Sequence, residues 1–243
     1  MVSTVGQTPR IGRILAAAHT LGVNGGTRSI TISEIARLAG VGRGTLYLYW
    51  SNKEDLLADL FAHDMFEMLS EIEQRVRIDP ALIAPHRLLP LVVGALDQHP
   101  FAAEVHSSDS GPLRSTATHP GIIDIKKYVG PVAIISRIFP VLRRHLVIRS
   151  DLDVEAQVYA AVSLIYGLEN RELVALKSDH VPTSNPQSIL GRTCAVLLEP
   201  LEPLEPDDYE SAAIDALADL SNAKDVALRQ LHSHGLGRTK ALR

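Results

Sequence analysis

The stretch TISEIARLAGVGRGTLYLYWSNKEDLL, residues 31–57, decides how the first part of this chain folds. Thr31 and Glu34 have the spacing of a capping box, in which both side chains satisfy free backbone N–H groups at the start of a helix. The glycines within residues 40–42 then favour a turn, because glycine readily adopts the backbone conformations that end a helix. A second capping box at Ser51–Glu54 predicts that a third helix begins directly after the second helix. Two short helices joined by a glycine turn and followed by a third helix are typical of a helix-turn-helix motif.

The second helix of the motif, predicted over residues 43–50, has two faces of different character. Leu46 and Trp50 lie four residues apart and share one face, which we expect to point into the core. The other face carries Arg43 and Tyr47, which a purely structural helix does not require. In the major groove of DNA, arginine donates two hydrogen bonds to a guanine edge, and apolar or aromatic groups contact the methyl group of thymine. The pattern therefore indicates a DNA-reading helix.

The same run resembles the DNA-binding signature of the TetR family of transcriptional regulators, without a gap, over about the first quarter of the chain. The resemblance implies an all-α fold, in which an N-terminal three-helix DNA-binding domain with a helix-turn-helix precedes a larger C-terminal helical domain for ligand binding and dimerisation. The residues that carry it are Thr31, Ile35, Ala36, Ala39, Gly40, Val41, Thr45, Tyr47, Tyr49, Trp50, Lys53 and Leu56.

The resemblance also implies which residues meet DNA. Lys53 suits a phosphate contact, because the free backbone N–H groups in the first turn of a helix favour an anion, and such contacts fix the register without reading sequence. In the alternative reading, Tyr47 and Tyr49 only pack against neighbouring helices. Gly42, where the family often has serine or threonine, is a weaker helix cap. The implied base-reading residues are Arg43, Gly44, Tyr47 and Leu48, and the implied phosphate-binding residues are Thr31, Thr45, Tyr49 and Lys53.

The net charge of −4 hides an uneven distribution of charged residues. Residues 1–53 contain six basic residues and one acidic residue, which gives +5 and leaves −9 for the rest of the chain. Positive charge concentrated in the N-terminal part is expected where only that part meets phosphate.

The remaining composition limits the class of protein. The chain has 243 residues, of which 46% are hydrophobic, and this is enough for one small and one larger helical domain. Its single cysteine, Cys194, excludes an intrachain disulfide framework and lies in an apolar run, so we predict a buried thiol in a reducing compartment. No secretory signal precedes residue 10, and no apolar stretch has the length of a membrane span. A cytoplasmic protein without a membrane partner is therefore expected.

Two successive domains are predicted. Residues 8–53 form the DNA-binding domain, whose first helix begins at Thr8-Pro9 and ends at Gly22. Residues 54–199 form the ligand-binding and dimerisation domain. They start within a helix that runs from residue 51 to about residue 79 and that, in the resemblance, joins the two domains. A rigid helix shared by both domains can convert ligand binding into a movement of the DNA-binding domain.

Residues 200–243 form an extension of the second domain. Proline at every third position over residues 200–206 predicts a stiff, extended linker. Residues 209–232 then have the pattern of one more amphipathic helix, and residues 235–243 are predicted to be a basic, disordered tail.

An effector pocket is predicted in the second domain. The apolar segment over residues 121–145 is interrupted by Pro131 and Pro140, each of which bends or breaks a helix. In the resemblance, an effector binds in a cavity between such helices, and the apolar lining indicates a small hydrophobic or amphipathic molecule. For every candidate, core packing remains the alternative. The candidate pocket residues are Phe101, His106, Tyr128, Ile135, Phe139, Tyr159 and Tyr166.

Two later helices are too apolar for an exposed surface. The first is predicted over residues 151–176 and the second over residues 189–198. In the resemblance, this pair builds a four-helix bundle across a two-fold axis, so a homodimer is predicted. Dimer symmetry in turn predicts a pseudo-palindromic operator in double-stranded DNA.

These observations together predict a DNA-binding transcriptional regulator, in this family usually a repressor that a small molecule releases from its operator. No enzymatic activity, cofactor or metal is predicted. One alternative is a metal-dependent helical hydrolase, which the dipeptide His63-Asp64 suggests. That dipeptide has no further ligands at a suitable spacing, and no phosphate loop, nucleophile elbow or paired-cysteine site is present. The other alternative is a DNA-binding protein that responds to no effector.

Overall fold

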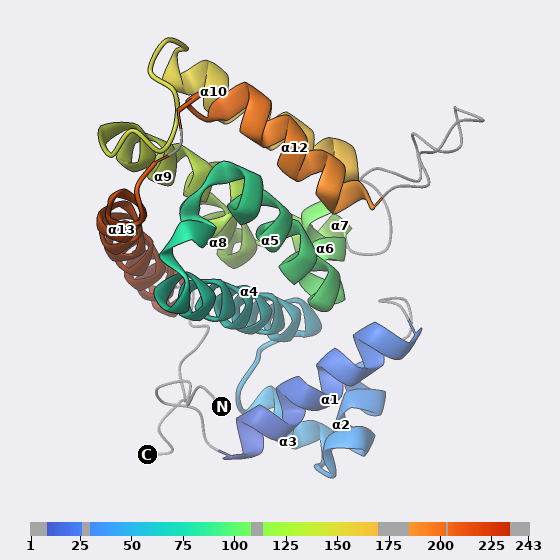
Figure 1. Ribbon diagram of the computed structural model, residues 1–243. Coiled ribbons are helices and arrows are strands. Elements are labelled where there is room, and N and C mark those ends of the chain that lie inside the picture. The colour runs from blue at the N-terminus through green and yellow to red at the C-terminus, as the bar shows by residue number, and fades with distance from the viewer. Residues whose placement is uncertain (1–8, 26–29, 108–113, 170–184, 203, 234–243) are drawn as a thin grey trace, which may run out of the picture. The chain divides into compact units, whose positions relative to one another are not determined.

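A computed structural model describes residues 9–25, 30–107, 114–169, 185–202 and 204–233 of the chain (Figure 1). Within these ranges the chain is helical and has no β-strand, which confirms the predicted all-α class. The elements are α1 (Pro9–Gly25), α2 (Ile32–Ala39), α3 (Arg43–Tyr47), α4 (Lys53–Ile78), the 3-10 helix η2 (Pro80–Ile83), α5 (Pro85–Gln98), α6 (Pro100–Ser107), α7 (Arg114–Ala117), α8 (Pro120–Val129), α9 (Pro131–Arg144), α10 (Val154–Glu169), α12 (Pro186–Leu198) and α13 (Pro206–Ser233).

Contacts between Cα atoms divide the chain into two compact units. The first unit comprises residues 1–67, 99–128 and 224–243, and the second comprises residues 68–98 and 129–223. Helices α4 and α13 each contribute residues to both units. The predicted domain ranges are defined by function rather than by contacts, and they stay a prediction.

The helix-turn-helix occupies the N-terminal part of the first unit, where α2 packs against α1 and α3 (Figure 1). Thr31 caps α2, since its side-chain oxygen accepts a hydrogen bond from the backbone N–H of Glu34 at 3.2 Å. The turn follows at Gly40, whose φ of 66° lies in the left-handed region that glycine adopts without strain. The predicted cap and turn are therefore confirmed. The buried side chains of these helices and the residues beside them are Ile11, Ile14, Leu15, Ala17, Ala18, Ile30, Ile35, Ala36, Ala39, Leu46 and Trp50.

The DNA-reading helix is shorter than the sequence predicts. It was expected over residues 43–50 but ends at Tyr47, and the backbone N–H of Trp50 then donates to the carbonyl oxygen of Leu46 in a turn. The indole N–H of Trp50 donates to Asp59 Oδ2 in α4 at 2.7 Å. This long-range hydrogen bond fixes the turn that ends α3, and no local sequence pattern predicts it.

The second capping box is displaced by one residue from its predicted position. Asn52 Oδ1 accepts from the backbone N–H of Asp55 at 2.8 Å, and Asp55 Oδ2 accepts from the backbone N–H of Ser51 at 3.2 Å. Helix α4 accordingly begins at Lys53. Serine and asparagine are about equally good N-caps, so the sequence alone does not separate the two registers.

A histidine connects the start of α4 to a later part of the first unit. His119 Nδ1 accepts a hydrogen bond from the backbone N–H of Gly121 at 3.1 Å, so the proton of the neutral ring lies on Nε2. That Nε2 donates to Asp55 Oδ1 at 3.2 Å. Because Asp55 also holds the first turn of α4, this contact joins the α7–α8 segment to the helix that follows the DNA-reading turn.

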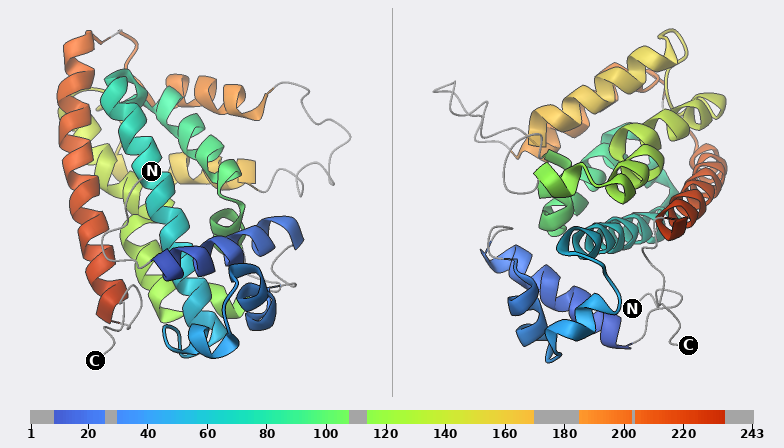
Figure 2. Two further views of the ribbon diagram at one scale, coloured as in Figure 1. Left: turned by 90° about the horizontal axis from the view of Figure 1, so that it is seen from below. Right: turned by 180° about the vertical axis from the view of Figure 1, so that it is seen from behind.

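In the second unit, α12 packs closely against α5 and also contacts α10 (Figure 2). A Cβ atom at Gly191 of α12 would lie 2.7 Å from the carbonyl oxygen of His86, so glycine is required for this approach. Glu199 strengthens the contact, because its Oε1 accepts from the backbone N–H of His86 at 2.6 Å. Cys194 of α12 is buried, and burial raises the pKa of its thiol to about 12. The predicted buried thiol is confirmed.

The two prolines of the apolar segment 121–145 act differently. The chain leaves α8 at Val129, and Pro131 opens α9 at a position where its missing N–H leaves no partner unsatisfied. Pro140 lies inside α9 without ending it, and its ring is exposed. Only the first proline therefore separates two helices.

Several predictions lie outside the described residues. They concern the N-terminal residues before Pro9, the end of the helix predicted over residues 151–176, and the tail over residues 235–243. The amphipathic helix predicted in the extension is confirmed as α13. None of the helices in the described part of the chain combines the length and the apolar character that crossing a bilayer requires.

Candidate nucleic-acid interface and effector pocket

The predicted base-reading residues lie on an open surface of α3. Arg43 and Gly44 are exposed, and the side chains of Tyr47 and Leu48 are 55% and 54% exposed. Exposed apolar and aromatic groups on this face can contact the methyl group of a thymine. The opposite face of the helix is closed, since Leu46 is almost fully buried. The structure thus separates a packing face from an available face as predicted, while the base contacts themselves stay a prediction.

The predicted phosphate-binding residues surround this face. Thr31 is exposed, and Thr45, Tyr49 and Lys53 are half-buried. Lys53 is the first residue of α4, where free backbone N–H groups add to the attraction of its ammonium group for an anion. The hydroxyl of Thr31 also donates to Glu34 Oε2 at 2.7 Å, so a phosphate contact would have to replace this bond.

Two contacts orient the polar side chains of the motif. Arg43 Nη1 donates to Ser33 Oγ at 3.3 Å, which links the first turn of α3 to α2. The rings of Tyr49 and Trp50 lie 5.7 Å apart between centroids at a tilt of 59°. Since Trp50 is bonded to α4, the ring contact positions Tyr49 relative to the start of that helix.

The predicted effector residues fall in both units. Tyr159 is 77% exposed on α10, which places it on the surface rather than in an enclosed cavity. The side chain of His106 lies outside what the structure describes. The buried members are Phe101, Ile135 and Phe139. Phe101, His106 and Tyr128 belong to the first unit, and Ile135, Phe139, Tyr159 and Tyr166 belong to the second. Their role in effector binding stays a prediction.

The second unit contains a cavity at a different place, lined by residues of α4, α5 and α12. Its volume of about 590 Å³ lies within the usual range for small-molecule sites. None of the predicted effector residues lines it. Its lining combines apolar groups with two guanidinium groups and the carboxylate of Glu71, and Arg87 Nη2 is 2.6 Å from Asp79 Oδ2. The lining includes Ile72, Arg75, Arg87, Pro90, Leu91 and Gly94.

No local sequence pattern identifies this cavity, because its lining comes from three helices, of which α12 is far from the other two in the sequence. Pro90 and Gly94 lie four residues apart on one strip of α5, but the longer side chains of Arg87 and Leu91 line the cavity beside them. The aromatic residues near prolines that the sequence offers as effector candidates lie elsewhere.

Residues 14–60 match the sequence pattern of the bacterial regulatory proteins of the tetR family. These residues form a tetR-type domain. The tetR-type domain is also similar to the fatty acid metabolism regulator protein of Bacillus subtilis, with 36% identity over 69 residues, which cover 28% of this chain and 36% of that protein. An uncharacterized HTH-type transcriptional regulator of Mycobacterium tuberculosis is 38% identical over 61 residues, which cover 25% of this chain and 32% of that protein. These matches span about a third of the relatives' own length.

Two solved structures resemble a larger share of the chain. The transcriptional regulator FadR of Bacillus subtilis, solved in complex with stearoyl-CoA, matches with a TM-score of 0.53 and 22% identity over 76% of this chain and 96% of that chain. The fatty acid degradation regulator FadR of Bacillus halodurans matches with a TM-score of 0.56 and 20% identity over 82% of this chain and 99% of that chain. These likenesses establish a common fold beyond the tetR-type domain.

Proposed function

We propose that this protein is a transcriptional regulator that binds a pseudo-palindromic operator as a homodimer and represses transcription until a small amphipathic effector releases it. The observation that carries the proposal is the open face of α3, where Arg43 and Tyr47 are exposed within a tetR-type domain. An effector releases DNA only if it binds the DNA-incompetent arrangement more tightly. A coupling free energy of about 1–3 kcal/mol between the two sites suffices for this.

The surface of α10 and α12 supports the dimer. On α12, Ile189 and Val196 lie seven residues apart on one face and are 40% and 79% exposed, and on α10 Tyr159 is exposed. An apolar face of this kind on two adjacent helices is the surface that a four-helix bundle buries across a two-fold axis. Two copies then present two α3 helices to successive major grooves on one side of the duplex.

The cavity of the second unit supports an amphipathic effector. Ile72, Leu91 and Pro90 offer apolar contacts, and Arg75 offers donors to an anionic group. Arg87 would contribute donors by exchanging part of its contact with Asp79. One structural neighbour, FadR of Bacillus subtilis, was solved with stearoyl-CoA, a molecule that has both an acyl chain and anionic groups. We infer a ligand of this chemical class, and stearoyl-CoA is the probe that tests it.

Replacing Arg43 with alanine is expected to weaken operator binding by about 1–3 kcal/mol and to relax specificity at one base position. The reason is that a guanidinium group recognises the edge of one guanine through two hydrogen bonds. Operator sequences are first selected from a random DNA pool with the full-length protein. The affinities of single-base operator variants for wild type and Arg43→Ala are then measured by fluorescence anisotropy at fixed salt.

Lys53→Ala provides the matched comparison, because both variants remove one positive charge from the same motif. Its effect should be similar for every operator variant, and the slope of log affinity against log salt should decrease by about 1. If Arg43→Ala also weakened all operators alike, Arg43 would be a phosphate contact and the base-reading assignment would be wrong. Failure of the pool to yield a palindrome would contradict the dimeric operator.

Filling the cavity by Gly94→Leu is expected to lower the affinity for stearoyl-CoA at least 10-fold, measured by isothermal titration calorimetry. The new side chain occupies ligand volume and displaces the amide of Gln187, which donates to Asp97 Oδ2 at 3.5 Å. A Cβ atom at Gly94 meets only the side chain of Gln187, at 3.3 Å, and the end of that side chain can move. Leucine also favours a helix interior more than glycine does, so the variant should fold.

Gly12→Leu in α1 is the control, since this helical glycine has no atom within 4 Å of an added Cβ and lies outside the cavity. It should bind stearoyl-CoA like the wild type. Equal affinity of wild type and Gly94→Leu for stearoyl-CoA would exclude this cavity as the binding site. The predicted effector residues that include Phe139 would then be the next candidates. Absence of binding to wild type would exclude the ligand class and leave the operator proposal untouched.

A further inference from the structure

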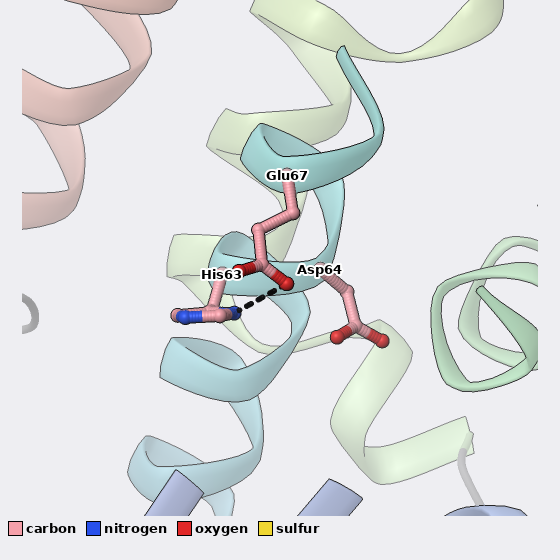
Figure 3. Close-up of side chains that lie close together, drawn as sticks. All are labelled: His63, Asp64 and Glu67. Atoms are coloured by element: carbon pink, nitrogen blue, oxygen red, sulfur yellow. Dashed lines mark ion pairs between the residues drawn. The ribbon is translucent and has the colours of Figure 1, made fainter. Parts of the chain in front are cut away.

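One turn of α4 carries three potential metal ligands outside the DNA-reading motif and the cavity (Figure 3). His63, Asp64 and Glu67 each offer one ligand atom, and these atoms lie within 4.8 Å of one another. His63 Nδ1 is 3.4 Å from Glu67 Oε2, as expected for residues four apart on a helix. Glu67, one helical turn after His63, thus adds a third potential ligand to the His63-Asp64 dipeptide.

Asp64 is the unusual member of this group. It is 2% exposed, and within the described ranges its Oδ2 accepts no hydrogen bond. The backbone N–H of Ala102 donates to the carboxyl group, but burial, followed by the charge of Glu67, raises the pKa of Asp64 to about 7. A buried carboxylate with an unsatisfied oxygen costs free energy and calls for an explanation in structural terms. A cation held between the Asp64 and Glu67 carboxylates supplies the missing partner and removes their repulsion.

A further imidazole group lies near the same carboxylate. His19 Nε2, from α1, is 3.8 Å from Asp64 Oδ1, which is too long for a hydrogen bond. A hydrogen bond from His19 is thus not what stabilises the carboxylate.

We propose that His63, Asp64 and Glu67 form a binding site for one divalent transition-metal cation, with Zn²⁺ as the best-matched ion. One imidazole nitrogen and two carboxylate oxygens suit Zn²⁺, Co²⁺ or Mn²⁺, whereas Ca²⁺ and Mg²⁺ prefer oxygen ligands throughout. The side chains of His63 and Glu67 are 22% and 47% exposed, so an ion reaches the buried carboxylate from the solvent side. The site is independent of the proposed operator and effector, since it requires neither of them.

The site is tested on the full-length protein after removal of metals with a chelator. Co²⁺ is titrated while its visible absorption is recorded, and Zn²⁺ affinity is measured by competition. Wild type should bind one ion per chain at this site. His63→Gln and Glu67→Gln should each weaken binding at least 10-fold, because each removes one of three protein ligands. Both side chains are partly exposed, and equal thermal midpoints of the metal-free proteins would establish that the variants fold.

His86→Gln is the matched control, because His86 also contacts a carboxylate, with Nδ1 at 2.8 Å from Glu199 Oε2, but lies in the second unit. His232→Gln/His234→Gln tests adventitious binding near the C-terminal end of the chain. Both controls should bind like wild type, and Zn²⁺ should raise the thermal midpoint of wild type and of the controls only. The proposal would be overturned if wild type bound no metal ion, or if His63→Gln and Glu67→Gln bound it with unchanged affinity.

Discussion

Val196→Glu is expected to convert the protein from a dimer into a monomer and to lower its affinity for a full operator at least 100-fold. Val196 is 79% exposed on α12, beside the exposed Ile189 and Leu197 of the same helix. If the proposed four-helix bundle buries this face, a glutamate there must be buried without a partner, which costs several kcal/mol. A monomer binds only one half-site, and it loses the roughly 10²–10⁴-fold gain that linking two binding events provides.

Analytical ultracentrifugation at micromolar concentration measures the oligomeric state, and fluorescence anisotropy measures the affinities for a full operator and for an isolated half-site. The control is Val132→Glu, which makes the same chemical change at a valine that is 46% exposed on α9, a helix outside the proposed four-helix bundle. This control should remain dimeric. A Val196→Glu protein that stays dimeric, or a wild type that is monomeric, would rule out the proposed interface. If Val196→Glu binds the isolated half-site with the same affinity as wild type, the tetR-type domain itself is intact.

The helix-turn-helix was predictable because the signals that define it are local. A cap at Thr31, a left-handed glycine at Gly40 and the spacing of Leu46 and Trp50 each act within a few residues, and all of them agree. The end of α3 was not predictable, since it depends on the bond from the Trp50 indole to Asp59 in another helix. Local patterns therefore identified the elements but not all of their boundaries.

The cavity and the metal ligands illustrate two different failures of prediction. The cavity is formed where α4, α5 and α12 meet, and Gln187 lies about ninety residues after Gly94 in the sequence, so packing alone creates it. By contrast, Glu67 lies one turn after His63, and its place on the same face follows from helical periodicity. The burial of Asp64, which distinguishes this turn from a solvated charge cluster, depends on long-range packing.

Asp64→Asn is expected to stabilise the metal-free protein at pH 8 by roughly 2–4 kcal/mol, and by clearly less at pH 5. The pKa of Asp64 is about 7 in the folded protein, above its ordinary value of 3.8. The folded state therefore binds the proton more tightly than the unfolded state does. The free energy of unfolding falls as the pH rises from about 4 to about 7, and the full penalty remains above pH 7. Asparagine carries no charge at any of these pH values and removes this pH dependence.

Chemical denaturation in the presence of a chelator measures the free energy of unfolding of both proteins between pH 5 and pH 8. Other groups can titrate in the same range, but the difference between the free energies of unfolding of wild type and Asp64→Asn isolates the carboxyl group. Asp151→Asn is the control, since it removes the same charge from an exposed residue whose pKa is lowered by its hydrogen bond to Arg149. Because Asp151 is ionised in both folded and unfolded states above pH 5, its difference from wild type should stay constant over this range. If the difference in free energy of unfolding between Asp64→Asn and wild type were also constant between pH 5 and pH 8, Asp64 would be ionised and hydrogen-bonded in the folded protein. The burial penalty assigned to it would then be wrong.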